Sequence, residues 1–274
     1  MELQFTKMTG AGNDFVLIDD RKTSLNLDWG TLAPRLCDRR YGIGADGLLV
    51  LEASNDADFG MKYYNADGSY GGMCGNGGRC AARFVMDEAG LSIARFDALG
   101  FTYRAHRVGQ FIELHMKDPI SLRKDILHVG SHKIPYVFID TGTAHAVIFV
   151  GDLEPVLAQM AASGEIQHIG SEIRNHAAFA PGGTNVNFVR VLDDGTLAMR
   201  TYERGVEAET LACGTGAIAS AIVSHLYKQT PVPTRVRTRS KEILEVGFKK
   251  EGNSIREVTL TGSADMVYSG KIAL

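Results

Sequence analysis

Apolar residues follow two patterns along the chain, one typical of strands and one typical of helices. Short apolar or alternating runs predict strands at residues 15–18, 48–51, 59–64, 94–116, 134–150, 186–191, 197–202 and from residue 235 onward. An apolar stripe over residues 25–39, with Asp28 as its N-cap, predicts an amphipathic helix. A further helix is expected over residues 152–162. The pattern therefore predicts a protein rich in strands.

Two other helices are apolar or small-residued around nearly their whole circumference. They follow Cys74 and Cys213, and Gly90 is the predicted C-cap of the first. A helix that is apolar on all sides is buried on all sides. Because each half of the chain also supplies many strands, we predict an α+β fold. In each half, a mostly antiparallel strand barrel would surround a central buried helix.

The same motifs occur in the same order in both halves of the chain. The matching pairs are Thr9-Gly10 with Thr141-Gly142, Gly44-Ala45-Asp46 with Gly183-Thr184-Asn185, Met61-Lys62 with Met199-Arg200, and Cys74 with Cys213. Their nearly constant separation indicates an internal duplication. We therefore predict two pseudo-symmetric domains, residues 1–117 and 118–262, with a C-terminal strand at 263–274 that returns to the first domain.

Composition and charge exclude several classes of function. The 274 residues are 45% hydrophobic and 22% charged, which is typical of a soluble globular protein. A net charge of −3 and the lack of a run of five basic residues argue against a nucleic-acid or membrane partner. The N-terminus lacks the pattern of a secretion signal, and the longest apolar helix, residues 217–227, is too short to span a bilayer. We therefore expect a cytoplasmic protein.

The four cysteines are of two kinds. They include no Cys-x-x-Cys pair and no usual zinc spacing, so we predict neither a disulfide framework nor a metal site. Cys37 and Cys80 lie within helices and are expected to act as small apolar residues. Cys74 and Cys213 instead lie where a helix begins, and the unpaired N–H groups and the macrodipole there lower a thiol pKa. We therefore predict that these two are acid/base groups.

Two such thiols suit the removal and return of a proton next to a carboxylate. This reaction needs a positioned base, stabilisation of the carboxylate as charge develops on it, and exclusion of water. Helix N-termini supply N–H donors for the carboxylate. When one thiolate takes the proton from one face and the second thiol delivers a proton to the other, the configuration inverts. The route requires no pyridoxal phosphate, and we expect no cofactor.

Polar residues on the repeated loops are candidates for ligand contacts. The asparagines among them are Asn13, Asn65, Asn76 and Asn185. A single asparagine on a glycine-rich turn usually stabilises that turn, but four on repeated loops favour a polar cage around a ligand. His145 and Glu203 also lie on duplicated loops, and we expect them to set the protonation of the thiols. The structural alternatives are a backbone-bonded turn histidine and a solvated ion pair of Glu203 with Arg204.

At these residues the chain resembles the diaminopimelate epimerase family. The matching motifs are residues 10–15, 42–47, 65–69, 74–77, 202–205 and 212–216, in the family's order and across the whole chain. The resemblance implies a two-domain fold of strand-wrapped helices. It also implies an isomerase that interconverts LL- and meso-2,6-diaminopimelate with two cysteines and without cofactor or metal. That step belongs to the synthesis of lysine and peptidoglycan precursors.

The resemblance also implies a role for each matching residue. Cys74 and Cys213 would be the acid/base pair, and His145 and Glu203 would tune the thiols. Substrate contacts would come from Asn13, Asn65, Gly75, Asn76, Thr143, Asn185, Glu203, Arg204, Gly214 and Thr215. Arg204 would pair the distal carboxylate in the fork geometry that arginine provides. Tyr268 matches a position associated with dimer contact, so a homodimer is expected.

Two positions depart from the family pattern. The chain has Gly142-Thr143-Ala144-His145 where the family often has Gly-Asn-Pro-His. Threonine still forms hydrogen bonds but is shorter than asparagine, and the loss of proline loosens the turn. Gly47 stands where some members place a glutamine on the substrate, so this contact is either missing or supplied by another residue. Both departures concern substrate fit more than the chemistry.

Three other functions compete with this one. A proline or hydroxyproline racemase or epimerase of the same superfamily would share the chemistry but would need an apolar pocket for a ring. The amide cage and Arg204 favour a second charged end on the substrate instead. The presence of both cysteines argues against a relative that has lost a thiol. The lack of Cys-x-x-Cys and of clustered histidines argues against a redox or metal-binding protein.

Overall fold

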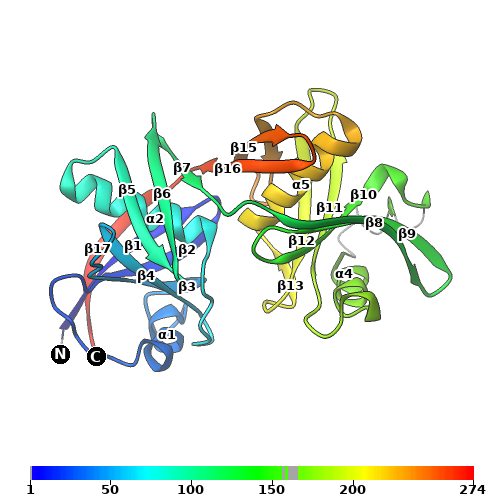
Figure 1. Cartoon of the computed structure of the whole chain (residues 1–274). Helices are drawn as coiled ribbons and strands as arrows, with labels where there is room; N and C mark the ends of the chain where they lie inside the picture. Colours follow the sequence, from blue (N-terminus) through cyan, green and yellow to red (C-terminus); the bar gives the residue numbers. More distant parts are fainter. Residues whose placement is uncertain (1, 156–157, 160–165) are drawn as a thin grey trace. The chain divides into compact units, whose positions relative to one another are not determined.

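The computed structural model describes residues 2–155, 158–159 and 166–274, and it divides into two compact units. Unit 1 comprises the chain up to His115 together with Thr261–Leu274, and unit 2 comprises Met116–Leu260 (Figure 1). The helix expected over residues 152–162 includes 156–157 and 160–162, which lie outside the described residues. No helix among the described residues is long and apolar enough to cross a membrane.

Unit 1 is a set of paired strands around one helix. Its elements are β1 (Glu2–Gly10), β2 (Asn13–Asp19), α1 (Trp29–Cys37), β3 (Gly47–Glu52), β4 (Phe59–Asn65), α2 (Gly75–Ala89), β5 (Ile93–Ala98), β6 (Phe101–Val108), β7 (Phe111–His115) and β17 (Asp265–Ala273). The antiparallel pairs are β1–β2, β1–β17, β3–β4, β5–β6 and β6–β7, and the parallel pairs are β2–β3 and β4–β5. Helix α2 contacts all eight of these strands.

Unit 2 repeats this plan. Its elements are β8 (Ile120–Val129), β9 (His132–Asp140), β10 (Ala144–Phe149), η1 (Val150–Asp152), α4 (Ile166–Arg174), η2 (Ala177–Phe179), β11 (Asn185–Val191), β12 (Leu197–Glu203), β13 (Ala208–Thr210), α5 (Gly214–Lys228), β14 (Thr234–Arg237), β15 (Ile243–Glu251) and most of β16 (Ser254–Gly262). Antiparallel β9–β10, parallel β10–β11, antiparallel β11–β12, parallel β12–β14 and antiparallel β14–β15 follow the order found in unit 1. Helix α5 contacts β9–β12, β14 and β15.

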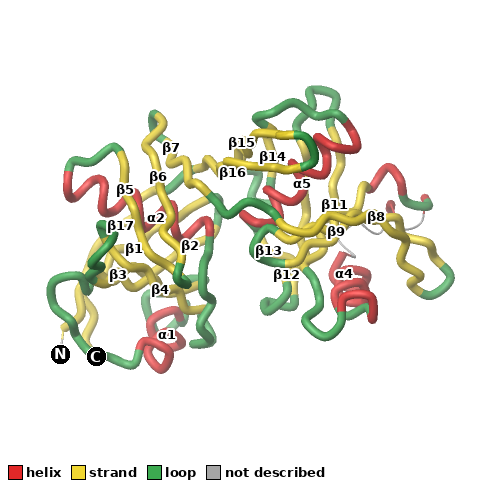
Figure 2. Tube along the Cα trace, viewed as in Figure 1, coloured by secondary structure: helices red, strands yellow, loops and turns green. Residues whose placement is uncertain are grey.

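This correspondence confirms the predicted pseudo-symmetric α+β fold. Each unit places one helix inside a wrapping of strands (Figure 2). Most of the strand pairs are antiparallel. The burial of the two helices agrees, since the side chains from Cys80 to Ala82 and from Ala217 to Ser224 are fully enclosed. The predicted cap at Gly90 is also confirmed, because this residue ends α2 in the left-handed region with a φ of 66°.

A second helix packs against the sheet in each unit. Helix α1 begins after Asp28, whose Oδ1 accepts a hydrogen bond from Thr31 N at 3.2 Å, as predicted for an N-cap. Leu48 of β3 packs with α1 in one apolar cluster, whereas the next residue, Leu49, lies against Gly77 of α2. Strand β3 is therefore buried on both faces, which explains why its sequence is continuously apolar. In unit 2, α4 packs in the same way against β11 and β12.

Candidate active site

Each of the two predicted thiols caps the central helix of its own unit. Cys74 has the extended backbone of an N-cap residue, and its Sγ accepts a hydrogen bond from Gly77 N at 3.5 Å. Cys213 caps α5 in the same way, with Gly216 N donating to its Sγ at 3.4 Å. Cys213 is 5% exposed and Cys74 is half-buried. A sulfur that accepts an N–H bond at a helix N-terminus is in surroundings that favour the thiolate.

The other two cysteines lie in different surroundings. Burial raises the pKa of Cys37 to about 12 and the pKa of Cys80 to about 12. Both therefore remain thiols at neutral pH, as expected of buried apolar residues. No group of three or more His, Cys, Asp or Glu side chains suited to holding a metal occurs in the part of the chain that the structure describes.

In unit 1, Asn76 connects the start of α2 to the start of β2. It is 2% exposed, and its Nδ2 donates to Asn13 Oδ1 at 2.5 Å. Its Oδ1 accepts from Nη2 of Arg79 at 2.8 Å. Arg79 is fully buried and also donates to the carbonyls of Gly75 and Ser263, each at 3.4 Å. Two of the predicted substrate-binding amides are thus joined directly to each other and fixed by a buried cation.

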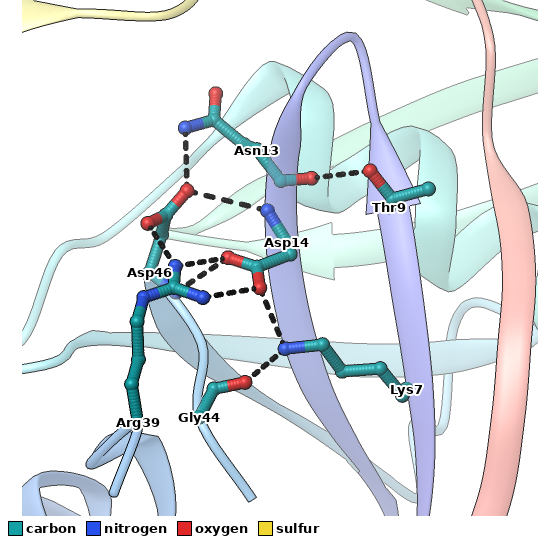
Figure 3. Close-up of polar contacts among 7 residues, drawn as sticks. All are labelled: Lys7, Thr9, Asn13, Asp14, Arg39, Gly44 and Asp46. Carbon is teal, nitrogen blue, oxygen red and sulfur yellow. Dashed lines mark hydrogen bonds and ion pairs between the residues drawn. The ribbon is translucent and has the colours of Figure 1, made fainter.

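An ion-pair network holds Asn13 from its other side (Figure 3). Asn13 Nδ2 donates to Asp46 Oδ2 at 3.1 Å, and Arg39 donates to both Asp46 and Asp14, at 2.8 Å and 2.7 Å. Lys7 Nζ donates to Asp14 Oδ2 at 2.7 Å. Although burial alone would raise it, hydrogen bonds from Arg39 and Lys7 lower the pKa of Asp14 to about 2. The network ties the loop before β3 to the β1–β2 hairpin and leaves the Asn13 amide in one orientation.

The position of the missing glutamine, Gly47, is filled by an aromatic ring. A Cβ on Gly47 would lie 2.5 Å from Cε2 of Tyr63, and a Cβ on Gly71 would lie 2.5 Å from Cδ1 of the same ring. The Tyr63 ring therefore lies between Gly47 and Gly71. Gly71 precedes Cys74 by three residues in the sequence. Asn65, on the same face of β4, donates from Nδ2 to Ser69 Oγ at 2.9 Å. A side chain at residue 47 has no room, because its Cβ would also lie 2.7 Å from the backbone O of Tyr64.

In unit 2, His145 is fully buried on β10 and bonded through both ring nitrogens. Asn187 Nδ2 lies 2.9 Å from His145 Nδ1, and Thr143 Oγ1 lies 3.0 Å from His145 Nε2. Thr201 Oγ1 donates to Asn187 Oδ1 at 2.8 Å. Burial, and then the positive charge of Arg204, lower the pKa of His145 to about 3. The imidazole is therefore neutral at pH 7.

Thr143 continues from His145 to the start of α5. Its Oγ1 donates to Thr215 Oγ1 at 3.2 Å, and Thr215 Oγ1 lies 3.6 Å from Cys213 Sγ. Thr141 Oγ1 also donates to the carbonyl of Thr215 at 3.3 Å. The turn before Thr143 contains Gly142 with a φ of +95°, a conformation that glycine adopts without strain. The structure thus brings His145, Thr143, Thr215 and Cys213 together.

The remaining predicted residues of unit 2 lie at the ends of neighbouring strands. Asn185 donates from Nδ2 to Ala144 O at 3.2 Å and accepts from Arg204 N at 2.8 Å, so it joins β10, β11 and the end of β12. The Arg204 guanidinium donates to Gly182 O at 3.3 Å. Glu203 ends β12 and is half-buried. Gly214, like Gly75 in unit 1, is the first residue of its central helix and is buried.

Four residues that contact this machinery were not predicted from the sequence: Tyr63, Arg79, Asp46 and Asn187. Asn187 had a usable signal, because it is a polar residue inside the apolar strand β11. Arg79 had one too, since it is a cation within the run of small residues that begins α2. The places of Asp46 and Tyr63 depend on contacts across the fold, namely the bond to Asn13 and the packing on Gly71.

Solved structures of other proteins share this fold. A hydroxyproline epimerase from Agrobacterium vitis aligns with a TM-score of 0.72 at 16% identity, covering 100% of this chain and 93% of that one. A PhzF-family phenazine biosynthesis protein from Bacillus anthracis aligns with a TM-score of 0.71 at 13% identity, covering 100% of both chains. The fold is thus that of the two-domain racemases and PhzF-type proteins, here with a cysteine capping each central helix.

Sequence comparison then gives the family. A family model described as diaminopimelate epimerase matches residues 5–97 and 137–267. The diaminopimelate epimerase of Chlorobaculum tepidum is 43% identical over 273 residues, covering 97% of this chain and 100% of that protein. That of Aquifex aeolicus is 38% identical over 286 residues, covering 99% and 98%. The chain belongs to the diaminopimelate epimerase family, as its motifs indicated.

Proposed function

We propose that this chain interconverts LL- and meso-2,6-diaminopimelate by moving the α-proton between Cys74 and Cys213. Membership of the diaminopimelate epimerase family carries the proposal. The geometry of the two thiols supports it, since each sulfur accepts a backbone N–H bond at the N-cap of a central helix. The product would serve the synthesis of lysine and peptidoglycan precursors.

The reaction is a two-base proton transfer. One cysteine, as a thiolate, takes the α-proton, and the C–H electron pair moves toward the carboxylate. Backbone N–H groups of Gly75, Asn76, Gly214 and Thr215 are the proposed donors that stabilise this charge. The second cysteine, as a thiol, delivers its proton to the opposite face of the same carbon. One sulfur has then gained a proton and the other has lost one, and exchange with solvent restores the starting state.

The rest of the substrate needs groups that bind a second amino-acid end. We assign this role to Asn13, Asn65, Asn185, Glu203 and Arg204, with the Arg204 guanidinium pairing the distal carboxylate. Asn185 contributes through Arg204, since its Oδ1 accepts the Arg204 amide N–H at 2.8 Å. Thr143 is discussed below, and Gly47 contributes no side chain. His145 tunes the thiols as a neutral ring, and Glu203 does so as a carboxylate.

The assembly and location are part of the same proposal. We propose a homodimer that forms through β17, where Met266, Val267 and Tyr268 are exposed by 50%, 56% and 46%. Adjacent exposed apolar side chains of this kind commonly mark protein interfaces. A cytoplasmic location fits a chain with only four cysteines among its 274 residues and no disulfide framework in their spacing.

Substrate choice is the test of this function, because a proline-type racemase shares the fold. The protein is incubated in deuterium oxide with LL-diaminopimelate or with L-proline, and the α-proton signal is followed by NMR. We expect exchange and formation of the meso isomer with diaminopimelate only. Cys74→Ala and Cys213→Ala should each abolish isomer formation, whereas Cys37→Ala should retain it. Exchange on proline but not on diaminopimelate would overturn the proposal.

A further inference from the structure

A continuous chain of hydrogen bonds runs through unit 2 and ends at the sulfur of Cys213. Its successive separations are 2.8 Å from Thr201 to Asn187, 2.9 Å to His145, 3.0 Å to Thr143, 3.2 Å to Thr215 and 3.6 Å to Cys213. Thr201, Asn187 and His145 are each at most 2% exposed. Such a chain has one consistent direction of donation, because each member uses its acceptor on one side and its donor on the other.

The buried end of the chain fixes that direction. Thr201 donates to Asn187 Oδ1, which leaves the Asn187 Nδ2 group to donate to His145 Nδ1. A neutral imidazole that accepts at Nδ1 carries its proton on Nε2. His145 therefore donates from Nε2 to Thr143 Oγ1, and Thr143 donates onward to Thr215. The Thr215 hydroxyl proton is then left to point at Cys213 Sγ.

We propose that this chain of hydrogen bonds makes Cys213, rather than Cys74, the resting thiolate. Thr143 is then the positioning residue that connects His145 to Cys213. A hydroxyl that donates to sulfur stabilises the anion more than the thiol, since charge-assisted hydrogen bonds are the stronger kind. The Gly216 N–H bond to the same sulfur acts in the same sense. The catalytic meaning of a resting thiolate rests on the proposed function, but the protonation state itself does not.

The corresponding place in unit 1 is occupied differently. Asn76 follows Cys74 by two residues, as Thr215 follows Cys213. Its side chain is bonded to Asn13 through Nδ2 and to Arg79 through Oδ1. The Asn76 amide is therefore engaged in the contact between α2 and β2. The two matched helix starts therefore differ in the side chain two residues after the cysteine, since Thr215 contacts a sulfur whereas Asn76 is bonded to Asn13 and Arg79.

Both cations and carboxylates lie near this hydrogen-bond chain in unit 2. Arg204 is close enough to His145 to disfavour its protonation, so its positive charge acts on the same region. The Glu209 carboxylate on β13 is paired with Arg200 at 2.7 Å and with Arg239. The Asp140 carboxylate at the end of β9 accepts the Gly142 N–H at 2.9 Å. Glu203, the last residue of β12, is a third carboxylate in this part of unit 2.

The Thr143 position also explains one departure from the family pattern. Where the family often has asparagine, a threonine hydroxyl both accepts from His145 and donates to Thr215. His145 then acts as a neutral donor within the hydrogen-bond chain and not as a base that removes a proton from a thiol. A threonine at this place is therefore a functional substitute in this chain.

The test compares Thr143→Val with wild type by the pH dependence of thiol alkylation. Iodoacetamide modification of each cysteine is followed by peptide mass spectrometry between pH 5 and 10. In wild type we expect Cys213 to be alkylated at lower pH than Cys74. Thr143→Val should slow Cys213 alkylation at pH 7 by roughly tenfold, which is about one pKa unit. The Cys74 profile should stay unchanged, and Thr143→Ser should restore the wild-type profile.

Thr234→Val is the control, since Thr234 is a threonine of unit 2 whose hydroxyl is also bonded within the protein, in its case to Pro231 O. An unchanged Cys213 profile in folded Thr143→Val, or a Cys74 that is the first to react in wild type, would overturn the proposal. A second measurement needs no variant: long-range 15N NMR should show His145 protonated at Nε2 from pH 5 to 9. A ring protonated at Nδ1 would also overturn it. Neither experiment uses substrate, so both outcomes are independent of activity on diaminopimelate.

Discussion

Asn187 donates a hydrogen bond from Nδ2 to Nδ1 of His145 across 2.9 Å, and both side chains are fully buried. The contact sets which nitrogen of the imidazole carries its proton. It also brings a polar strand residue against the start of α5, where a Cβ on Gly216 would lie 2.5 Å from Asn187 Oδ1. The glycine at that place therefore allows the close approach on which the hydrogen-bond chain depends.

Removal of the Asn187 amide should destabilise the protein. Asn187→Ala leaves His145 Nδ1 and the Thr201 hydroxyl buried without their partner. Each such loss costs about 1–3 kcal/mol, so we expect the free energy of unfolding to fall by at least about 2 kcal/mol. Urea denaturation measures it, with the exposed Asn253→Ala as control. An Asn187→Ala protein as stable as the control would contradict the account of this chain.

The ion-pair network around Asp14 should make a pH-dependent contribution to stability. The native pKa of about 2 lies below the ordinary value of 3.8, so the pairing stabilises the folded state fully above about pH 4. The contribution, about 2 kcal/mol, is lost as the pH falls through 2. We therefore expect Asp14→Asn to be less stable than wild type at pH 7, with a gap that narrows toward pH 2.

The measurement for this network is urea unfolding at several pH values. Asp193→Asn serves as control, because Asp193 is exposed in a turn outside the network. A gap between wild type and Asp14→Asn that stays constant from pH 7 to pH 2.5 would show that the Asp14 carboxylate is not held by Lys7 and Arg39 as described.

The Tyr63 ring and Gly47 should be energetically coupled. Gly47→Ala inserts a methyl group against the ring, and overpacking of this kind costs about 1–3 kcal/mol. Tyr63→Ala removes the ring and leaves a cavity, while the backbone O of Tyr64, 2.7 Å from the same Cβ position, stays in place. The double variant should therefore be more stable than the sum of the single changes predicts, by at least about 0.5 kcal/mol. Strict additivity in urea unfolding would mean that Tyr63 does not occupy the space next to residue 47.

The four cysteines should separate into two classes by reactivity. Because burial raises the pKa of Cys37 and of Cys80 to about 12, both are thiols up to pH 9 and should resist iodoacetamide in the folded protein. Cys74 and Cys213 should be labelled first. Peptide mapping after partial labelling measures the order, with labelling in urea as the control for complete reaction. Early modification of Cys80 in native conditions would contradict the burial on which the distinction rests.

Sequence patterns predicted the features of this fold that depend on residues close together in the sequence. Asp28 was predicted as a cap because its side chain can accept a hydrogen bond from the first turn of the helix. Gly90 was predicted as a cap because a residue without a side chain adopts the left-handed backbone that ends a helix. The strand β8 was missed because its apolar residues Ile120, Leu122 and Ile126 are interrupted by the charged run of residues 123–125, and residues 120–126 are all exposed. Helix α4 buries only Ile166, Ile169, Gly170 and Ile173, in a segment that was not assigned to any element.

The same distinction holds for the site. Cys74 and Cys213 were found because the sequence repeats around them and each starts a helix. The Arg79–Asn76–Asn13 and Asn187–His145–Thr143 contacts could not be predicted, since they join residues from elements far apart in sequence. A sequence pattern shows that a residue is polar and on a loop, but only the packed fold shows whether its hydrogen bonds are already used within the protein.

The central claim is that two sulfurs act on opposite faces of one carbon, and isotope incorporation during the first turnover tests it most directly. LL-diaminopimelate is mixed with excess enzyme in deuterium oxide and quenched before equilibrium, and the α-positions of both isomers are measured by mass spectrometry and NMR. A two-base reaction predicts that the meso product carries solvent deuterium at the inverted carbon while the remaining LL substrate retains its proton. Deuterium that appears in recovered LL substrate as fast as in the product, or a product that keeps the original proton, would mean that a single base serves both faces.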